Sequence, residues 1–273
     1  MTLTADQIAS FERDGFLALP DFVPVERCEE LRRRALALEA EQRAVDPDAV
    51  TVFSTTDQAH AGDEWFLDSG DKVRGFFEDD GRQLNKLGHA MHDLDPVFDR
   101  FCRETGLGEI AADVGMRDPQ LVQSMYIFKH AGAGGEVTWH TDHTYLWTEP
   151  RSVIGFWFAI DEATTENGCL WAIPGGHRIP VKSRFVRDGD QATTEVYDDS
   201  PYPIDDAVPV PAAPGTLVLL DGALPHWSDA NRSDHERQAF TLHVTDGATE
   251  WSQRNWLQRA ADMPFRGFEP SPA

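Results

Sequence analysis

Cysteines, basic residues and long hydrophobic runs are all scarce in this sequence, and each shortage excludes a class of protein. The three cysteines, Cys28, Cys102 and Cys169, are too few and too far apart for a disulfide framework or a zinc knuckle, which suits a reducing compartment. No window approaches the ~18 consecutive apolar residues of a membrane-spanning helix, and the N-terminus has no basic stretch followed by an apolar one. We therefore expect a soluble, cytoplasmic protein that does not enter a membrane.

Basic residues are outnumbered by acidic ones. The chain has 24 Lys and Arg against 47 Asp and Glu, which gives a formal net charge of −23. Such a chain repels nucleic acid and anionic lipid at long range, so neither is an expected partner. We interpret most of the acidic residues as a solvated surface. A small molecule bound in a local basic pocket is compatible with this surplus.

The length and composition predict one domain over residues 1–273, because 273 residues with 41% hydrophobic content can bury a large core. The region 1–45 reads as helical. Thr4 and Gln7 have the spacing of a capping box, and Gly15 ends the first helix. A second helix is predicted by a buried stripe at helical spacing, formed by Cys28, Leu31, Ala35 and Leu38.

The region from about residue 119 to 246 changes to short, β-rich runs separated by turn residues. Six strands of this kind predict a mainly β fold with flanking helices, either a barrel or a double-sheet roll. A stretch rich in Asp and Pro interrupts them within residues 183–214, and we interpret it as a surface insertion, conceivably a lid. The predicted strands contain QLVQSMYIFK, EVTWHTDHTYLW, SVIGFWFAI, CLWAIPGGH, GTLVLLD and QAFTLHVTD.

Two histidines and one aspartate form a candidate metal site. In a strand, side chains two residues apart share a face, so His140 and Asp142 are expected to point the same way. Alone, such a pair is more often a hydrogen-bonded pair than a metal site. His226, which follows the apolar run GTLVLLD, supplies a distant second imidazole. Two imidazoles and one carboxylate form the facial triad of non-haem Fe(II) oxygenases, although zinc can use the same ligands.

An arginine follows the second histidine at a short distance. Arg237 lies eleven residues after His226, in a strand where it shares a face with Ala239 and Thr241. On the small, polar face of a barrel strand it points inward, where a buried guanidinium needs a carboxylate partner. That partner could be the far carboxylate of a dicarboxylic cosubstrate. His243, on the same face as Arg237, is a candidate neighbour of the metal ligands. His143 is expected to pack on the face of its own strand opposite to His140.

These motifs together resemble the phytanoyl-CoA dioxygenase family of Fe(II)- and 2-oxoglutarate-dependent oxygenases. The resemblance rests on His-x-Asp, the distant His and the following Arg, and it covers nearly the whole chain. Two positions depart from the family pattern: Thr141 stands where Gln is common, and PGGH stands where PGSH is usual. Further matching segments are FERDGFLALPDFV, FLDSGDKVRGFFE, LNKLGHAMHDLDPVF, VQSMYIFK, DEATTENGCLWAIPGGH and NWLQ.

The resemblance implies a double-stranded β-helix core, the jelly-roll of cupin-like proteins. It implies that His140, Asp142 and His226 hold Fe(II) and that Arg237 and Ser228 bind 2-oxoglutarate. Ser228 is two residues after His226, so in an extended stretch it faces the same way. The further 2-oxoglutarate contacts that the resemblance implies are Lys86, Met125 and Trp157. Their own surroundings suggest an ordinary solvated lysine on a helix and two core side chains.

The implied activity is hydroxylation of an aliphatic C–H bond with O2, releasing succinate and CO2, with ascorbate as a supporting reductant. Asp142 favours hydroxylation, because related halogenating enzymes have a small residue there. We expect a small apolar or mixed-character substrate; a coenzyme A thioester, as in an acyl-CoA 2-hydroxylase, fits the acidic chain less well. The alternatives are a non-catalytic cupin-like metal-binding or sensing protein and a zinc hydrolase. The candidate aromatic walls of the substrate pocket are Trp139, Tyr145, Trp147 and Phe156.

Overall fold

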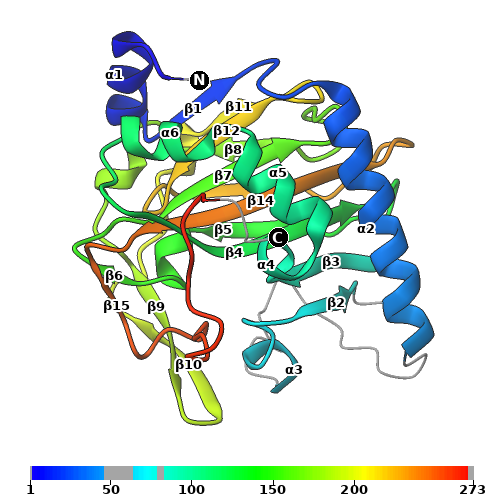
Figure 1. The fold of residues 1–273 in the computed structure, drawn as a ribbon. Coiled ribbons are helices and arrows are strands. Elements are labelled where there is room, and N and C mark those ends of the chain that lie inside the picture. Colours follow the sequence, from blue (N-terminus) through cyan, green and yellow to red (C-terminus); the bar gives the residue numbers. More distant parts are fainter. Residues whose placement is uncertain (1, 46–63, 79–82, 270–273) are drawn as a thin grey trace.

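A computed structural model describes residues 2–45, 64–78 and 83–269, and within it two β-sheets make up most of the architecture (Figure 1). The larger sheet has seven strands and the smaller has four. In the larger sheet the order is β1 (Phe16–Leu19), β12 (Leu217–Asp221), β7 (Ile154–Ala159), β14 (Arg237–Asp246), β4 (Pro119–Lys129), β3 (Leu84–His89) and β2 (Val73–Phe77). In the smaller sheet it is β11 (Val208–Val210), β8 (Leu170–Ala172), β13 (His226–Ser228) and β5 (Val137–His140).

The alternation along β14 shows how the larger sheet divides its two faces. Phe240, Leu242 and Val244 belong to the main hydrophobic core, whereas Arg237 and Thr241 line a pocket on the other face. This is the division that the period-2 pattern predicts. The pocket-side face packs against the smaller sheet, and the two sheets contribute Trp157, Leu220, Leu170 and Ala172 to one cluster.

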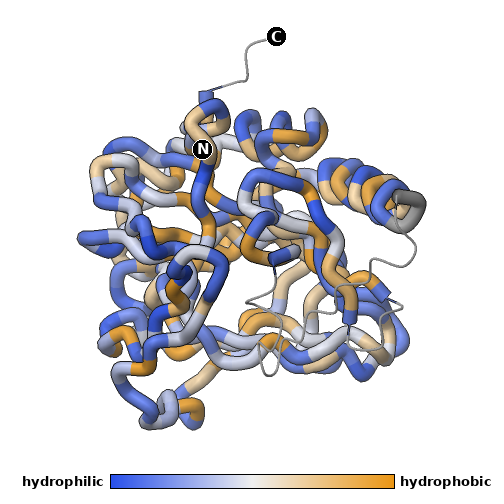
Figure 2. Tube along the Cα trace, turned by 90° about the horizontal axis from the view of Figure 1, so that it is seen from below, coloured by the Kyte–Doolittle hydropathy of each residue, from blue (hydrophilic) through white to orange (hydrophobic). Residues whose placement is uncertain are grey.

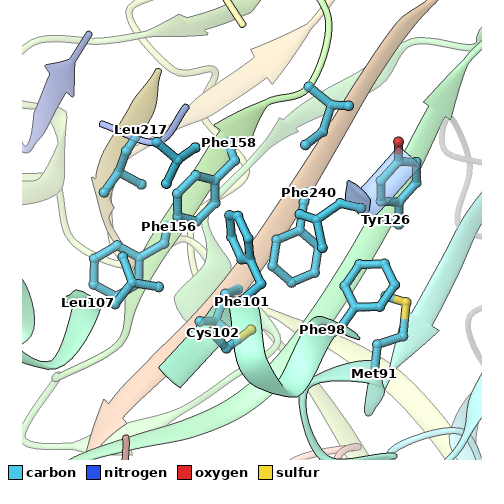
Figure 3. Packing of buried hydrophobic residues seen from close by; sticks show 14 of the residues in the cluster. Met91, Phe98, Phe101, Cys102, Leu107, Tyr126, Phe156, Phe158, Leu217 and Phe240 are labelled. Carbon is cyan, nitrogen blue, oxygen red and sulfur yellow. The ribbon is translucent and has the colours of Figure 1, made fainter. Parts of the chain in front are cut away.

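Helices cover the outer face of the larger sheet (Figure 1). Figure 3 shows Phe98 and Phe101 of one helix packed against Phe158 and Phe240 of the sheet. The ring centroid of Phe101 lies 5.0 Å from that of Phe158 and 5.7 Å from that of Phe240. The stripe predicted in the second helix is buried in the same core. The helices are α1 (Ala5–Asp14), α2 (Val25–Val45), α3 (Glu64–Leu67), α4 (Met91–Leu94), α5 (Pro96–Glu104) and α6 (Leu107–Asp113).

The predicted helix ends are confirmed. Thr4 and Gln7 form the capping box of α1, and Gly15 ends this helix with a φ of 81°, a left-handed conformation that suits glycine. Along α2, hydrophobic and hydrophilic stretches alternate, as expected for a helix with one buried stripe (Figure 2). Among the described residues no helix combines the length and the apolar composition needed to cross a bilayer.

Two segments differ from the sequence prediction. The segment around Lys86 was expected to be helical but forms strand β3, which pairs with β2 and β4, and only Met91–Leu94 after it is helical. All six residues of β3 are buried, so the period-2 alternation that marks a half-exposed strand is absent. The 183–214 insertion contains a hairpin of β9 (Ser183–Asp188) and β10 (Gln191–Val196), and its β11 completes the smaller sheet.

A buried carboxylate ties the C-terminal segment to the helices. Asp93 Oδ1 lies 3.0 Å from Arg103 Nη2 and 2.7 Å from Arg266 Nη2, and Asp93 Oδ2 lies 3.3 Å from Arg259 Nη1. Burial opposes the charged form of Asp93, but the surrounding His92 and arginines outweigh it and lower the pKa of this carboxyl. Asp93 thus contacts three guanidiniums from two distant parts of the chain, and Asp99 shares those of Arg103 and Arg266.

Replacing this acid should destabilise the protein. We expect Asp93→Asn to lower the free energy of unfolding by about 3 kcal/mol, because it removes the acid that pairs with buried Arg259 and one of the two acids that pair with Arg103 and Arg266. Urea denaturation monitored by circular dichroism measures the change. The exposed Asp262→Asn variant is the matched control and should stay within about 0.5 kcal/mol of wild type. Equal free energies of unfolding for the two variants would contradict the stabilisation assigned to the Asp93 network.

Candidate active site

His140, Asp142 and His226 come together between the sheets. One potential ligand atom from each lies within 4.8 Å of the others. β5 and β13 are antiparallel neighbours and place His140 opposite His226, with ring centroids 4.3 Å apart. The pairing of two short strands from distant parts of the chain therefore creates the two-histidine half of the cluster.

Asp142 reaches the cluster by a different route from the one expected. The sequence pattern placed it in the same strand as His140, but β5 ends at His140 and Asp142 begins a 3₁₀ helix, Asp142–Thr144. The Asp142 carbonyl accepts hydrogen bonds from the backbone N–H groups of Tyr145 and Leu146, which hold this turn. Asp142 still faces the histidines, so the prediction of a common side was right although its structural reason was wrong.

Both imidazoles are oriented by carbonyl groups. His140 Nδ1 donates to Thr138 O at 2.8 Å, and His226 Nδ1 donates to Leu224 O at 2.9 Å. Because a carbonyl only accepts, each ring carries its proton on Nδ1 and presents the lone pair of Nε2. The two Nε2 atoms lie 4.0 and 3.8 Å from Asp142 Oδ1. Fixing one ring nitrogen so that the other can bind a metal is the usual arrangement around histidine ligands.

The charge state of the cluster also suits a metal ion. Burial and the neighbouring His226 lower the pKa of His140 to about 4, so this imidazole is neutral at pH 7. Burial opposes ionisation of Asp142, but His243, His226 and His140 outweigh it and lower its pKa. Asp142 Oδ2 is buried without a hydrogen-bond partner. Two imidazole nitrogens and an ionised carboxylate with one orphaned oxygen form a donor set that fits Fe(II).

His243 lies beside this cluster. Its Nε2 is 3.2 Å from Asp142 Oδ1, and its side chain projects from β14 on the pocket side. The sequence pattern had placed it there as a candidate neighbour of the metal ligands. Gly155 of β7 pairs with His243 and lies so close to Asp142 that a Cβ at this position would be 3.0 Å from Asp142 Oδ2.

A cavity of about 180 Å³ opens beside the cluster. Its lining includes all five residues that the family resemblance assigns to 2-oxoglutarate, namely Lys86, Met125, Trp157, Ser228 and Arg237. Lys86 was expected to be an ordinary solvated side chain, but it is 8% exposed and lies over the rings of Phe66 and Phe76. Burial lowers its pKa to about 7.

Arg237 is the most unusual group in this cavity. It is 1% exposed, and its Nε and Nη1 atoms have no hydrogen-bond partner. Burial lowers its pKa to about 10, so the guanidinium stays charged at neutral pH. A buried cation without a bound acid is costly, and a carboxylate of a ligand would remove that cost. The orphaned donors therefore fit a dicarboxylic cosubstrate.

Lys129 was missed by the sequence analysis. It is 1% exposed and pairs with Arg237 in the β4–β14 ladder. Its Nζ donates to Ser228 Oγ at 2.8 Å and also to the carbonyl of Asp229. Burial, with the nearby Arg237, lowers its pKa to about 6. The period-2 pattern of VQSMYIFK could have revealed it, because Lys129 shares a face with the pocket residues Met125 and Ile127.

The four aromatic candidates for the pocket walls divide into two pairs. Tyr145 and Phe156 line the cavity. Trp139 instead packs against Trp227, and Trp147 packs against His143, with ring centroids 5.8 and 4.8 Å apart. These last two are outside the cavity lining. The packing role expected for His143 is confirmed, since it is buried against Trp147.

Comparisons with solved structures show that the chain has a jelly-roll fold. A structure of EctD from S. alaskensis with 2-oxoglutarate and 5-hydroxyectoine matches with a TM-score of 0.66 at 22% identity, over 92% of this chain and 78% of that one. A structure of the non-heme alpha ketoglutarate dependent carbocyclase SnoK matches with a TM-score of 0.64 at 16% identity, over 91% and 86% of the two chains. The jelly-roll prediction is confirmed.

Sequence comparison gives the family. Residues 11–239 match the phytanoyl-CoA dioxygenase (PhyH) family. The chain is 39% identical to phytanoyl-CoA dioxygenase domain-containing protein 1 of Mus musculus, over 96% of this chain and 97% of that protein. It is 37% identical to a phytanoyl-CoA dioxygenase of Arabidopsis thaliana, over 95% of each. The protein belongs to the phytanoyl-CoA dioxygenase family, which confirms the resemblance drawn from its motifs.

Buried neutral histidines should make the metal-free protein sensitive to acid. His140 and His143 have pKa values lowered to about 4, below the ordinary value of about 6.5, chiefly by burial. As pH falls below about 6.5, the unfolded chain therefore binds protons that the folded protein does not. We expect the free energy of unfolding to decrease from pH 7 to pH 4, by up to roughly 3 kcal/mol for each group.

Urea denaturation in the presence of a chelator, repeated across this pH range, measures the decrease. His143→Phe should show a smaller decrease, because it removes one of the buried imidazoles that titrate only in the unfolded chain over this range. The exposed His235 supplies the control variant His235→Phe, whose pH dependence should match wild type. Constant stability between pH 7 and pH 5 would refute the assignment of neutral buried imidazoles.

Proposed function

We propose that this protein is an Fe(II)- and 2-oxoglutarate-dependent dioxygenase that hydroxylates an aliphatic C–H bond of a small apolar or mixed-character molecule. One observation carries the proposal. The orphaned guanidinium of Arg237 lines the same cavity as His140, Asp142 and His226. A metal site alone needs no such cation, whereas a dicarboxylate bound next to the metal does. Membership of the phytanoyl-CoA dioxygenase family supports the same activity.

The proposed ligands of iron are His140 Nε2, Asp142 and His226 Nε2. Iron with bound 2-oxoglutarate and O2 supplies the oxidising chemistry, in which 2-oxoglutarate becomes succinate and CO2 and an oxygen atom enters the substrate C–H bond. The protein's part is to orient the ligands through Thr138 O and Leu224 O and to keep Asp142 ionised beside His243. Ascorbate is the expected supporting reductant.

The proposed site for the far carboxylate of 2-oxoglutarate consists of Arg237, Ser228 and Lys129. Arg237 provides the charge and two free donors. Ser228 Oγ already accepts a hydrogen bond from Lys129 Nζ, so its own proton is available for the carboxylate. Met125, Trp157 and Lys86 are proposed as further contacts along the cosubstrate. Lys129 thus acts through Ser228 as a positioning residue.

The substrate is proposed to be a free small molecule. The cavity wall is largely apolar and includes Tyr145, Phe156 and Trp256. A coenzyme A thioester would bring several phosphate charges to a chain with a net charge of −23, which opposes its approach. An acyl-CoA 2-hydroxylase is therefore the second candidate, favoured by the name of the family. We also propose that residues 1–273 act as one domain, because α1 and α2 share the core of the larger sheet.

Succinate formation is the decisive test of the activity. We expect purified protein with Fe(II), 2-oxoglutarate, ascorbate and air to release succinate slowly even without added substrate, and Asp142→Ala to release none, because it loses an ionised ligand. Chromatography of the product measures succinate, with an anaerobic sample as the control. Turnover that is supported by zinc and does not depend on oxygen would indicate a hydrolase. If the protein binds the metal but forms no succinate under any condition, it is a binding or sensing protein.

Binding of 2-oxoglutarate tests the far-carboxylate site without turnover. Under anaerobic conditions with Mn(II) in place of Fe(II), we expect Arg237→Ala to raise the Kd at least about thirtyfold, because truncating one partner of a buried charged contact costs about 2 kcal/mol or more. Lys129→Met should raise it about fivefold, since only the orientation of Ser228 is lost.

Isothermal titration calorimetry measures both Kd values. In a Ser228→Ala background the Lys129→Met change should have much less effect than in wild type, because the serine through which Lys129 acts is gone. An unchanged Kd in Arg237→Ala would remove the main support for the proposed cosubstrate.

A further inference from the structure

His89 is a buried imidazole that the proposed chemistry does not use. It ends strand β3, is 0% exposed and lines the cavity beside the metal cluster. Three aromatic rings surround it: Phe66, Phe76 and Trp256 lie with their centroids 5.5, 5.2 and 5.0 Å from that of His89. A phenylalanine would suit such a cage, so the two ring nitrogens need an explanation.

One nitrogen has a defined partner. His89 Nδ1 lies 2.8 Å from Ser69 Oγ, and Ser69 is itself fully buried. The hydroxyl of Ser69 donates its only proton to the carbonyl of Phe66, at 2.5 Å. Ser69 Oγ can therefore only accept from the imidazole, which places the proton of His89 on Nδ1. The Phe66 carbonyl fixes the tautomer of His89 through the serine.

The other nitrogen has no partner, and His89 is among the residues that line the cavity. His89 Nε2 is buried and makes no hydrogen bond. With the proton on Nδ1, this nitrogen is an acceptor. Burial opposes protonation of Nε2, and the neighbouring Lys86, His243 and Arg259 oppose it further. Together they lower the pKa of His89 well below its ordinary value. The cavity therefore presents one fixed, uncharged acceptor within an aromatic wall.

We propose that His89 Nε2 recognises the substrate by accepting a hydrogen bond from a hydroxyl or N–H group on an otherwise apolar molecule. This inference rests on the proposed function and names the substrate class more closely. A substrate that carries only acceptors, such as an ether or an ester, leaves His89 Nε2 unsatisfied, and a buried polar group that loses its partner discriminates strongly between ligands. Binding is therefore selective for donors.

The tautomer can be tested on the metal-free protein. In a sample labelled with ¹⁵N-histidine, we expect the His89 ring, assigned with a His89→Phe variant, to give a protonated Nδ1 and an unprotonated Nε2 at pH 7. Its signals should not titrate between pH 5 and pH 8. A protonated Nε2 at pH 7 would overturn the proposal, because the cavity would then offer a donor instead of an acceptor.

Recognition is tested with a matched pair of probes, cyclohexanol and methoxycyclohexane. They share an apolar ring, but only the alcohol can donate a hydrogen bond. In wild type we expect the alcohol to bind about fivefold more tightly than the ether and to shift the Nε2 signal. His89→Phe, which keeps a ring in the aromatic cage, should abolish this preference. Equal affinity for both probes, or no shift of Nε2 by the alcohol, contradicts the proposal.

Ser69→Ala supplies a second variant that leaves the cavity wall unchanged. It removes the acceptor of His89 Nδ1–H, so the proton can move to Nε2 and the preference for the alcohol should fall towards unity. Persistence of the full preference in Ser69→Ala would show that the serine does not fix the tautomer. Because these measurements need neither iron nor turnover, they can fail while wild-type 2-oxoglutarate binding and succinate formation succeed, and the reverse.

Discussion

The antiparallel pairing of β5 with β13 is the interaction on which the candidate site depends. It joins segments more than 80 residues apart and sets His140 directly opposite His226. Each imidazole is then locked by a carbonyl two residues earlier in its own chain segment, at Thr138 and Leu224. Strand pairing thus fixes where the rings lie, and local backbone bonds fix which nitrogen each ring presents. The carboxylate of Asp142 joins them from a short helical turn.

The burial of basic side chains is the second organising feature. Between the two sheets, Lys86, Lys129 and Arg237 are all nearly inaccessible to water. The nearby buried acid, Glu78, has a pKa raised by its own burial and is held by Asn85 and Gly135. Arg237, whose pKa of about 10 keeps it charged, gives the cavity a positive end inside a strongly acidic protein. Such a local reversal of sign favours a small dianion over a large polyphosphate, which would also meet the acidic exterior.

The hydrophobic core between the helices and the larger sheet offsets the free-energy cost of burying these polar groups. Packed aromatic rings from α5 and the larger sheet supply apolar burial on the face away from the cavity (Figure 3). The Asp93 network adds a link from the C-terminal segment to α4 and α5. Stability is thus concentrated outside the cavity, and the inner face can carry the polar groups that chemistry requires, including the orphaned nitrogens of Arg237 and His89.

Elements with a local sequence pattern could be predicted from the sequence. Hydrophobic periodicity predicted the second helix and the two faces of β14, and cap residues predicted the ends of α1. The family motifs pointed to five residues that line the cavity, whereas two of the four predicted aromatic walls, Trp139 and Trp147, lie outside it. The sequence prediction failed for β3, where burial on both faces removes the alternation, and for Asp142, where a turn replaces the expected strand. Such local signals disappear where the tertiary environment is uniform.

The partners of the buried polar atoms could not be predicted in this way, because they depend on how distant segments pack. Lys129 shares the face of Met125, but its bond to Ser228 depends on two strands from different sheets meeting. The tautomer of His89 depends on Ser69, twenty residues away, and on the direction of a single hydroxyl proton. Residue types and their spacing determine which polar groups lie on one face of a strand or helix, because the backbone repeat fixes which side chains point the same way. Which donor meets which acceptor is settled when packing removes water and leaves each buried atom few possible partners or none.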